Sequence, residues 1–249
     1  MTATITALAV APVKGMRLTP VDEAEIESTG VAGDRAFLVV DHDDRLLLST
    51  RTPRLLEVAP RWRDGVLGLT FPDGREVAEE LKPGPRATTA NYEGRRISGR
   101  LVEGELAAAL SEHLERPVRL LAREASDRGA DDAPVTLMSE ASLGALAPSL
   151  DGATPDPRRF RMTITIDGVD AWEEHGWAGR ELAGGEAVLR VTAPVPRCVV
   201  TTRDPDSGRR DVPTLKALAQ LRGKDDVTFG VWCEVVAPGR VRVGDAVVP

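Results

Sequence analysis

The sequence lacks most of the residue patterns that would reveal a chemistry directly. Among its 249 residues are only two cysteines, Cys198 and Cys233, and only three histidines, His42, His113 and His175. Two cysteines with no CxxC or Cys/His pattern exclude a disulfide framework and give no indication of a zinc or iron–sulfur site. Because the histidines lie far apart in sequence, we expect each to be a surface or packing residue rather than a metal ligand.

Long apolar runs and positive charge are also scarce. No apolar run approaches the roughly 20 residues that a membrane-spanning helix needs, and the N-terminus lacks the leading positive charges of a signal peptide. The formal net charge is −7. Nucleic-acid affinity depends on a basic face that neutralises phosphates. We therefore expect a cytoplasmic protein with no membrane and no nucleic-acid partner, although a local arginine cluster still allows a small anionic ligand.

Short segments of alternating or continuous apolar residues dominate the chain and predict strands. The turn Pro72–Asp73–Gly74 predicts a hairpin between residues 66–71 and 75–77. Many short strands at such spacing favour a barrel or sandwich over a parallel sheet. The other predicted strands cover residues 4–10, 21–28, 36–40, 46–48, 160–166, 186–192, 197–201, 227–236, 240–243 and 246–248.

Three segments have the apolar spacing of helices. They cover residues 103–115, residues 139–150 with Ser139 as N-cap, and residues 212–221 with Pro213 near the first helical position. The polar segment 123–134 predicts a linker and a domain boundary. The patterns together predict a mixed fold dominated by strands, with three or four packed helices.

Cys198 is the residue with the most suggestive surroundings. Pro194 and Pro196 stiffen the backbone before it, and Arg197 can favour the thiolate, the form that binds metals or attacks electrophiles. The alternative is that Cys198 is a small buried apolar residue, as many free cysteines are. Cys233 lies within a strand pattern, which favours a packing role.

Two cationic residues follow predicted turns at strand ends. Lys14 comes after the first strand, and Arg35 precedes the apolar run 36–40. Both can meet an anionic ligand, although strand ends also carry solvated charges. No phosphate-binding loop or dinucleotide fingerprint is present. The acidic segments 41–44 and 204–208 are typical of turns, and the second lacks the spacing of a calcium-binding loop.

The order and spacing of several short motifs resemble a family in which a MOSC N-terminal β-barrel domain precedes a MOSC domain. This family includes the mitochondrial amidoxime-reducing components and bacterial counterparts, and the resemblance covers nearly the whole chain. The motifs are Pro12–Val13–Lys14, Gly33–Asp34–Arg35, Ser49–Thr50–Arg51, residues 137–143, Arg159–Phe160–Arg161, Arg197–Cys198, Thr201–Thr202, residues 204–208, Phe229–Gly230 and Val243–Gly244–Asp245.

The resemblance implies a fold and a cofactor. The fold would be α+β and mainly β, with an N-terminal β-barrel-like domain over residues 1–122, a MOSC-type β-barrel domain over 123–249 and a few packed helices. Cys198 would be the protein ligand to the molybdenum of a molybdopterin cofactor. The residues that would bind the phosphate and pterin of this cofactor are Lys14, Arg35, Arg161 and Arg197, with Ser139 nearby.

The implied activity is reduction of N-hydroxylated small molecules such as amidoximes, hydroxamic acids and hydroxylamino-purines. Electrons would come from a separate ferredoxin- or flavoprotein-type protein. The alternative is a molybdenum-cofactor or sulfur carrier that reduces no outside substrate. The chain departs from the family at Gly15, where a serine is common, at Met162–Thr163, where Pro-Asn is common, and at Trp232, where a tyrosine occurs. These departures bear on substrate choice more than on cofactor binding.

Overall fold

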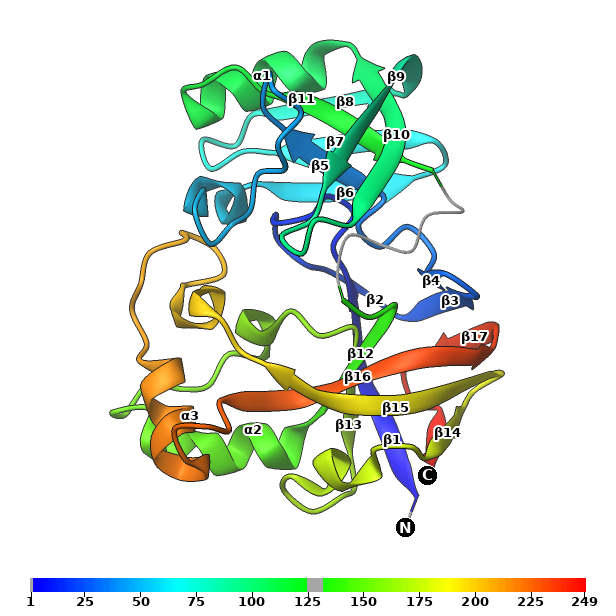
Figure 1. Ribbon diagram of the computed structural model, residues 1–249, viewed down its shortest axis with the longest axis vertical. Helices are drawn as coiled ribbons and strands as arrows, with labels where there is room; N and C mark the ends of the chain where they lie inside the picture. The colour runs from blue at the N-terminus through cyan, green and yellow to red at the C-terminus, as the bar shows by residue number, and fades with distance from the viewer. Residues whose placement is uncertain (1, 125–131) are drawn as a thin grey trace.

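In the computed structural model, which describes residues 2–124 and 132–249, seven strands close into a barrel (Figure 1). We call this unit the C-terminal barrel, although its first strand is the first of the chain. The short strand β2 (Thr19–Val21) adds to β1 outside the closed ring. Around the barrel the order is β1 (Ala3–Val10), β13 (Ile164–Asp167), β12 (Val135–Ser139), β16 (Thr228–Ala237), β15 (Ala187–Pro196), β14 (Glu181–Gly184) and β18 (Ala246–Val248).

One pair of neighbours in the barrel, β12 and β13, is parallel, and the other pairs are antiparallel. A parallel pair needs a crossover connection, and here that connection contains α2 (Glu140–Leu146). Ser139 caps this helix as predicted, because its hydroxyl accepts a hydrogen bond from the backbone N–H of Ser142 at 3.1 Å. The helix continues as the 3-10 turn η2 (Ala147–Ser149), and α3 (Thr214–Arg222) packs beside it.

A second unit lies above the barrel in Figure 1, and we call it the N-terminal lobe. Its helix α1 (Glu105–Leu114) buries Leu106, Leu110 and Leu114 as one stripe, in agreement with the predicted helix and its i, i+4, i+8 spacing. One sheet contains β5 (Phe37–Val40), β11 (Arg119–Arg123), β10 (Arg96–Glu103) and β9 (Lys82–Ala90). The other contains β6 (Ala59–Arg63), β7 (Val66–Thr70) and β8 (Glu76–Glu80), and η1 (Pro53–Glu57) precedes it.

A small sheet between the two units mixes the two ends of the chain. In it β3 (Glu23–Glu27) pairs with both β4 (Gly30–Val31) and β17 (Gly239–Arg242). Together with β1, these pairings place most of the first 31 residues with the C-terminal barrel. The boundary between residues 122 and 123 stays a prediction for the sequence, and residues 125–131 of the predicted linker lie outside the described residues.

The prediction of a mainly β fold with a barrel and a few packed helices is confirmed. Three predicted strands differ from the structure. Residues 46–48 form no strand, and Leu46 makes only an isolated bridge with Val40. Residues 157–160 form the 3-10 turn η3 (Pro157–Phe160), so the predicted strand 160–166 begins only at Ile164. The predicted strand 197–201 is absent, because β15 ends at Pro196 and η5 (Val199–Thr202) follows. Another 3-10 turn, η4 (Glu173–Trp177), covers one side of the barrel.

None of the helices in the described part of the chain combines the length and the apolar character that a bilayer crossing requires.

Candidate functional site

An open cavity of about 230 Å³ lies where the N-terminal lobe meets the C-terminal barrel. Its walls come from segments that are far apart in sequence. The first half of the chain contributes Lys14, Gly15, Arg35, Leu48, Ser49, Thr50 and Tyr92. The second half contributes Asp132, Thr136, Phe160, Arg161, Met162, Val195, Pro196, Arg197, Cys198, Val200 and Trp232.

Five of the six residues that the resemblance implies for cofactor binding line this cavity. They are Lys14, Arg35, Arg161, Arg197 and Cys198. Four of them are cationic and the fifth carries a thiol, so the fold gathers positive charge around one sulfur atom. The sequence separates these residues by up to 184 positions (198 − 14), and only the contact between the two units brings them together.

Cys198 combines a fixed backbone with an accessible side chain. Its carbonyl accepts hydrogen bonds from the backbone N–H and the hydroxyl of Thr201, at 3.2 and 3.1 Å. The side chain is exposed to solvent at the cavity, whereas Cys233 is buried. Burial raises the pKa of the Cys233 thiol to about 12. Of the two cysteines, Cys198 is therefore the one that can act as a thiolate ligand.

Arg197 adds a half-buried positive charge next to this thiol. Its guanidinium donates to the carbonyl of Phe229 at 2.9 Å, to the carbonyl of Phe160 at 3.2 Å and to the sulfur of Met162 at 2.7 Å. Burial lowers the pKa of Arg197 to about 9, so the group stays protonated at neutral pH. Its partners in the described ranges include no carboxylate, which leaves its charge available to an anion in the cavity.

Arg35 reaches the cavity from the turn before β5. Asp34 holds this turn, because its carboxylate accepts from the backbone N–H of Ala11 at 2.6 Å and also pairs with the Arg35 guanidinium. The same guanidinium donates to the carbonyl of Arg161 at 3.3 Å. This contact joins a residue of the first half of the chain to one of the second half, within the wall of the cavity.

Arg161 follows η3 in the left-handed conformation, with a φ of 56°. Such a backbone is uncommon for a residue with a side chain and is found where the surrounding structure enforces it. Here the buried residue Arg159, which belongs to η3, holds the turn in place through a bidentate ion pair with Asp211 at 2.7 and 2.8 Å. The turn thereby presents Arg161 to the cavity.

Ser139, the sixth residue, does not line the cavity. Its side chain is fully buried at the start of α2, where the hydroxyl lies 2.8 Å from that of Ser142 and 3.0 Å from a carboxylate oxygen of Glu174. Glu174 is also fully buried and contacts both serines. These bonds give Ser139 a role in capping and packing.

The departures from the family pattern lie in the cavity wall, at Gly15, Met162 and Trp232. A Cβ atom added at Gly15 would lie 3.7 Å from the Cβ of Ser49, which also lines the cavity. The Ser49 hydroxyl is thus close to the place that a serine at position 15 would occupy. The motif Ser49–Thr50–Arg51 contributed to the resemblance, but the sequence alone gave Ser49 no role. The aromatic side chain of Tyr92 was missed entirely.

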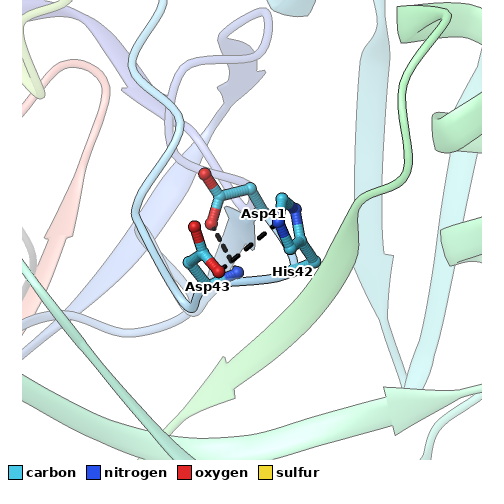
Figure 2. Close-up of side chains that lie close together, drawn as sticks. All are labelled: Asp41, His42 and Asp43. Atoms are coloured by element: carbon cyan, nitrogen blue, oxygen red, sulfur yellow. Dashed lines mark hydrogen bonds and ion pairs between the residues drawn. The ribbon is translucent and has the colours of Figure 1, made fainter.

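One group of potential metal ligands lies outside this cavity. The oxygen and nitrogen atoms of Asp41, His42 and Asp43 lie within 4.8 Å of one another (Figure 2). One Asp41 oxygen already accepts from the backbone N–H groups of Asp43 and Arg45, both at 2.9 Å, and Asp43 pairs with Arg45 at 3.0 Å. These bonds are those of a turn, as predicted for residues 41–44, and they explain why the three side chains lie close together.

Comparison with known proteins agrees with the architecture. Residues 2–117 match the MOSC N-terminal beta barrel domain, and residues 124–248 match the MOSC domain. The chain is 28% identical to mitochondrial amidoxime-reducing component 1 of Homo sapiens, and 28% identical to mitochondrial amidoxime reducing component 2 of Macaca fascicularis. Each alignment covers 98% of this chain and 82% of the relative.

Among solved structures, the YUAD protein from Bacillus subtilis superposes with a TM-score of 0.51 over 99% of this chain and 94% of that one. At 14% identity this likeness concerns the fold alone. The domain matches cover both halves of the sequence in the order that its motifs predict. The chain belongs to the MOSC domain family, in the form that carries a MOSC N-terminal beta barrel domain.

Proposed function

We propose that this protein binds a molybdenum cofactor in the cavity between its two units and reduces N-hydroxylated small molecules. The observation that carries the proposal is the convergence of one exposed thiol, Cys198, with four cationic side chains on one cavity. The relatives named amidoxime-reducing components support the same class of activity.

The residues of the cavity suit the chemistry of such a cofactor. A thiolate at Cys198 is a metal ligand, and the guanidinium groups of Arg35, Arg161 and Arg197 have the planar donor geometry that matches phosphate. Lys14 adds a compact positive charge. Arg197 is half-buried and has no carboxylate partner among the described residues, so a bound anion would neutralise its charge.

The cofactor, when bound, supplies the two-electron chemistry by which an N–OH group gains two electrons and two protons and becomes N–H, with release of water. The protein orients the cofactor through Cys198 and the arginines, and the open cavity admits the substrate beside Trp232 and Tyr92, which both line it. We assign electron supply to a separate ferredoxin- or flavoprotein-type protein, as the resemblance to the family implies.

The test combines metal content with turnover. Protein from a host that makes the cofactor should contain about one molybdenum per chain by elemental mass spectrometry, and should reduce benzamidoxime with an artificial electron donor. Cys198→Ala should abolish turnover. Cys233→Ala is the matched control, because it removes the other thiol outside the cavity and should retain turnover.

Two outcomes would count against the proposal. Molybdenum near zero in folded protein, from a host with a confirmed cofactor supply, would rule out cofactor binding. Molybdenum near one per chain without any reduction of benzamidoxime would favour the alternative, a cofactor or sulfur carrier.

A further inference from the structure

A second and larger cavity, which we call the outer groove, adjoins the candidate site. It has a volume of about 550 Å³ and lies between the loop 43–51 and the hairpin formed by β9 and β10. Leu48 and Tyr92 line both the outer groove and the cavity that contains Cys198. A molecule with one end near Cys198 can therefore extend its other end into the outer groove.

The outer groove carries two arginine side chains that are free to bind an anion. Arg51 and Arg96 are exposed, and within the described ranges neither guanidinium has a hydrogen-bond or ion-pair partner. The acidic side chains of the groove are already neutralised. Asp43 pairs with Arg45 at 3.0 Å and Asp44 with Arg119 at 2.7 Å. The groove therefore has an excess of positive charge in an otherwise acidic protein.

Two buried polar atoms in the hairpin wall of the groove also lack a partner. They are the hydroxyl of Thr89 and the amide nitrogen of Asn91, in side chains that are only 4% and 5% exposed. The amide oxygen of Asn91 is used by the turn, where it accepts from the N–H groups of Glu93 and Arg95. Buried polar atoms without partners are rare because each costs free energy. Both side chains line the groove, so its hairpin wall contains polar atoms whose hydrogen-bonding capacity the described residues leave unused.

The chain segment that connects the two cavities is short and is held by a hydrogen bond. Ser49 and Thr50 line the cavity with Cys198, and Arg51 follows directly in the outer groove. Two residues of extended chain span about 7 Å at most. The carbonyl of Thr50 accepts from Arg203 at 3.2 Å, so this loop is tied to the segment that follows Cys198.

We propose that the preferred substrates are N-hydroxylated compounds that carry a carboxylate or phosphate group at the end remote from the N–OH group. Arg51 and Arg96 bind this anionic group in the outer groove, and they are specificity-determining residues. This inference rests on the proposed function for the reacting end of the substrate. It adds the chemical class of the substrate's other end, the end remote from the N–OH group. The cavity that contains Cys198 does not define that class.

The experiment compares matched pairs of substrates that differ only in the anionic group. One pair is benzamidoxime and 4-carboxybenzamidoxime, and the other is a hydroxylaminopurine riboside and its 5′-monophosphate. We expect kcat/KM of the wild type to favour an anionic member about tenfold, the size of one charge-assisted hydrogen bond. The pair with the larger preference identifies carboxylate or phosphate as the group that the groove selects.

The double variant Arg51→Gln with Arg96→Gln should bring both ratios close to one, through a higher KM for the anionic members. Arg86→Gln is the matched control, because Arg86 is an exposed arginine of the same hairpin outside the groove, and it should leave the ratios unchanged. Equal kcat/KM within both pairs in the wild type, or ratios unaffected in the double variant, would overturn the inference while the reductase activity stands.

Direct binding separates this inference from the proposed function. If neither member of a pair is reduced, the inference can still be tested by binding alone. 4-Carboxybenzamidoxime and the 5′-monophosphate are then titrated by calorimetry into the wild type and the double variant. Binding of either compound that depends on Arg51 and Arg96 would support the outer groove as an anion site. Equal or absent binding in the two proteins would overturn it.

Discussion

At the scale of single residues, carbonyl oxygens orient two cationic side chains of the candidate site, those of Arg197 and Arg35. Arg197 donates to the carbonyls of Phe160 and Phe229, and Arg35 donates to that of Arg161 as well as to Asp34. A carbonyl orients a guanidinium without cancelling its charge. Among the described residues no carboxylate pairs with Arg197, so its guanidinium retains a positive charge in the cavity.

His175 provides a prediction at this scale. Both of its ring nitrogens are buried in η4, beside Arg222 and Arg197, and have no hydrogen-bond partner among the described residues. Burial, reinforced by these arginines and opposed by Asp226, lowers its pKa to about 4, against about 6.5 in an unfolded chain. Above pH 6.5 the imidazole is neutral in both states. As the pH falls from 6.5 to 4, only the unfolded state gains the proton, so stability falls.

His175→Gln should therefore reduce the loss of unfolding free energy between pH 7 and pH 5, measured by urea denaturation at each pH. His42→Gln, at an exposed histidine, should leave that loss unchanged. An identical pH dependence in His175→Gln and wild type would show that His175 does not titrate in this window.

At the scale of elements, the turn that follows Cys198 and η5 is fixed against the N-terminal lobe. One oxygen of Asp204 accepts from the backbone N–H and the hydroxyl of Ser207, at 2.7 and 2.8 Å. Gly208 closes the turn with a φ of 67°. A Cβ atom there would lie only 2.5 Å from the carbonyl oxygen of Pro53 in η1. The turn thus sets the distance between the thiol-bearing segment and the lobe.

Gly208→Ala should destabilise the protein by about 2–4 kcal/mol, because it adds a steric clash to the strain of a left-handed residue. Gly74→Ala is the matched control, since Gly74 also has a positive φ, of 84°, but nothing lies within 4 Å of its added Cβ. This control should lose only about 1 kcal/mol. Chemical denaturation of both variants makes the comparison, and equal losses would mean that the contact with Pro53 is not tight.

At the scale of the whole molecule, the two ends of the chain complete one barrel. β1 pairs with β13 on one side and with β18 on the other, and β3 pairs with β17. The C-terminal barrel therefore depends on residues that precede the N-terminal lobe in sequence. The lobe is in effect inserted between the first strand of the barrel and the rest of it (Figure 1).

A fragment of residues 123–249 should consequently fail to form a closed barrel, because β13 and β18 would both present unpaired edges. We expect it to lack a cooperative thermal transition by circular dichroism. The same fragment joined to residues 1–31 through a flexible linker should regain one. A cooperative transition in the shorter fragment at the temperature of the full chain would show that β1 is dispensable.

The sequence by itself determined what short-range patterns encode. The hairpin at Pro72–Asp73–Gly74, the cap at Ser139 and the apolar stripe of α1 were all predictable, because each depends on neighbours within a few residues. The order of the motifs also indicated the family and the resemblance that assigns Cys198 its role. The proline-rich approach to Cys198 was visible, but its continuation as a strand was predicted wrongly, since β-branched residues 199–202 form a 3-10 turn.

Only the tertiary structure decided how distant segments meet. It placed Lys14 and Arg35 in one cavity with Arg161, Arg197 and Cys198, and it buried Ser139 outside that cavity. It also assigned the first strand to the C-terminal barrel and opened the outer groove beside the site. The physical reason is that barrel closure and the packing of two units depend on pairings across more than 100 residues, which no local pattern specifies.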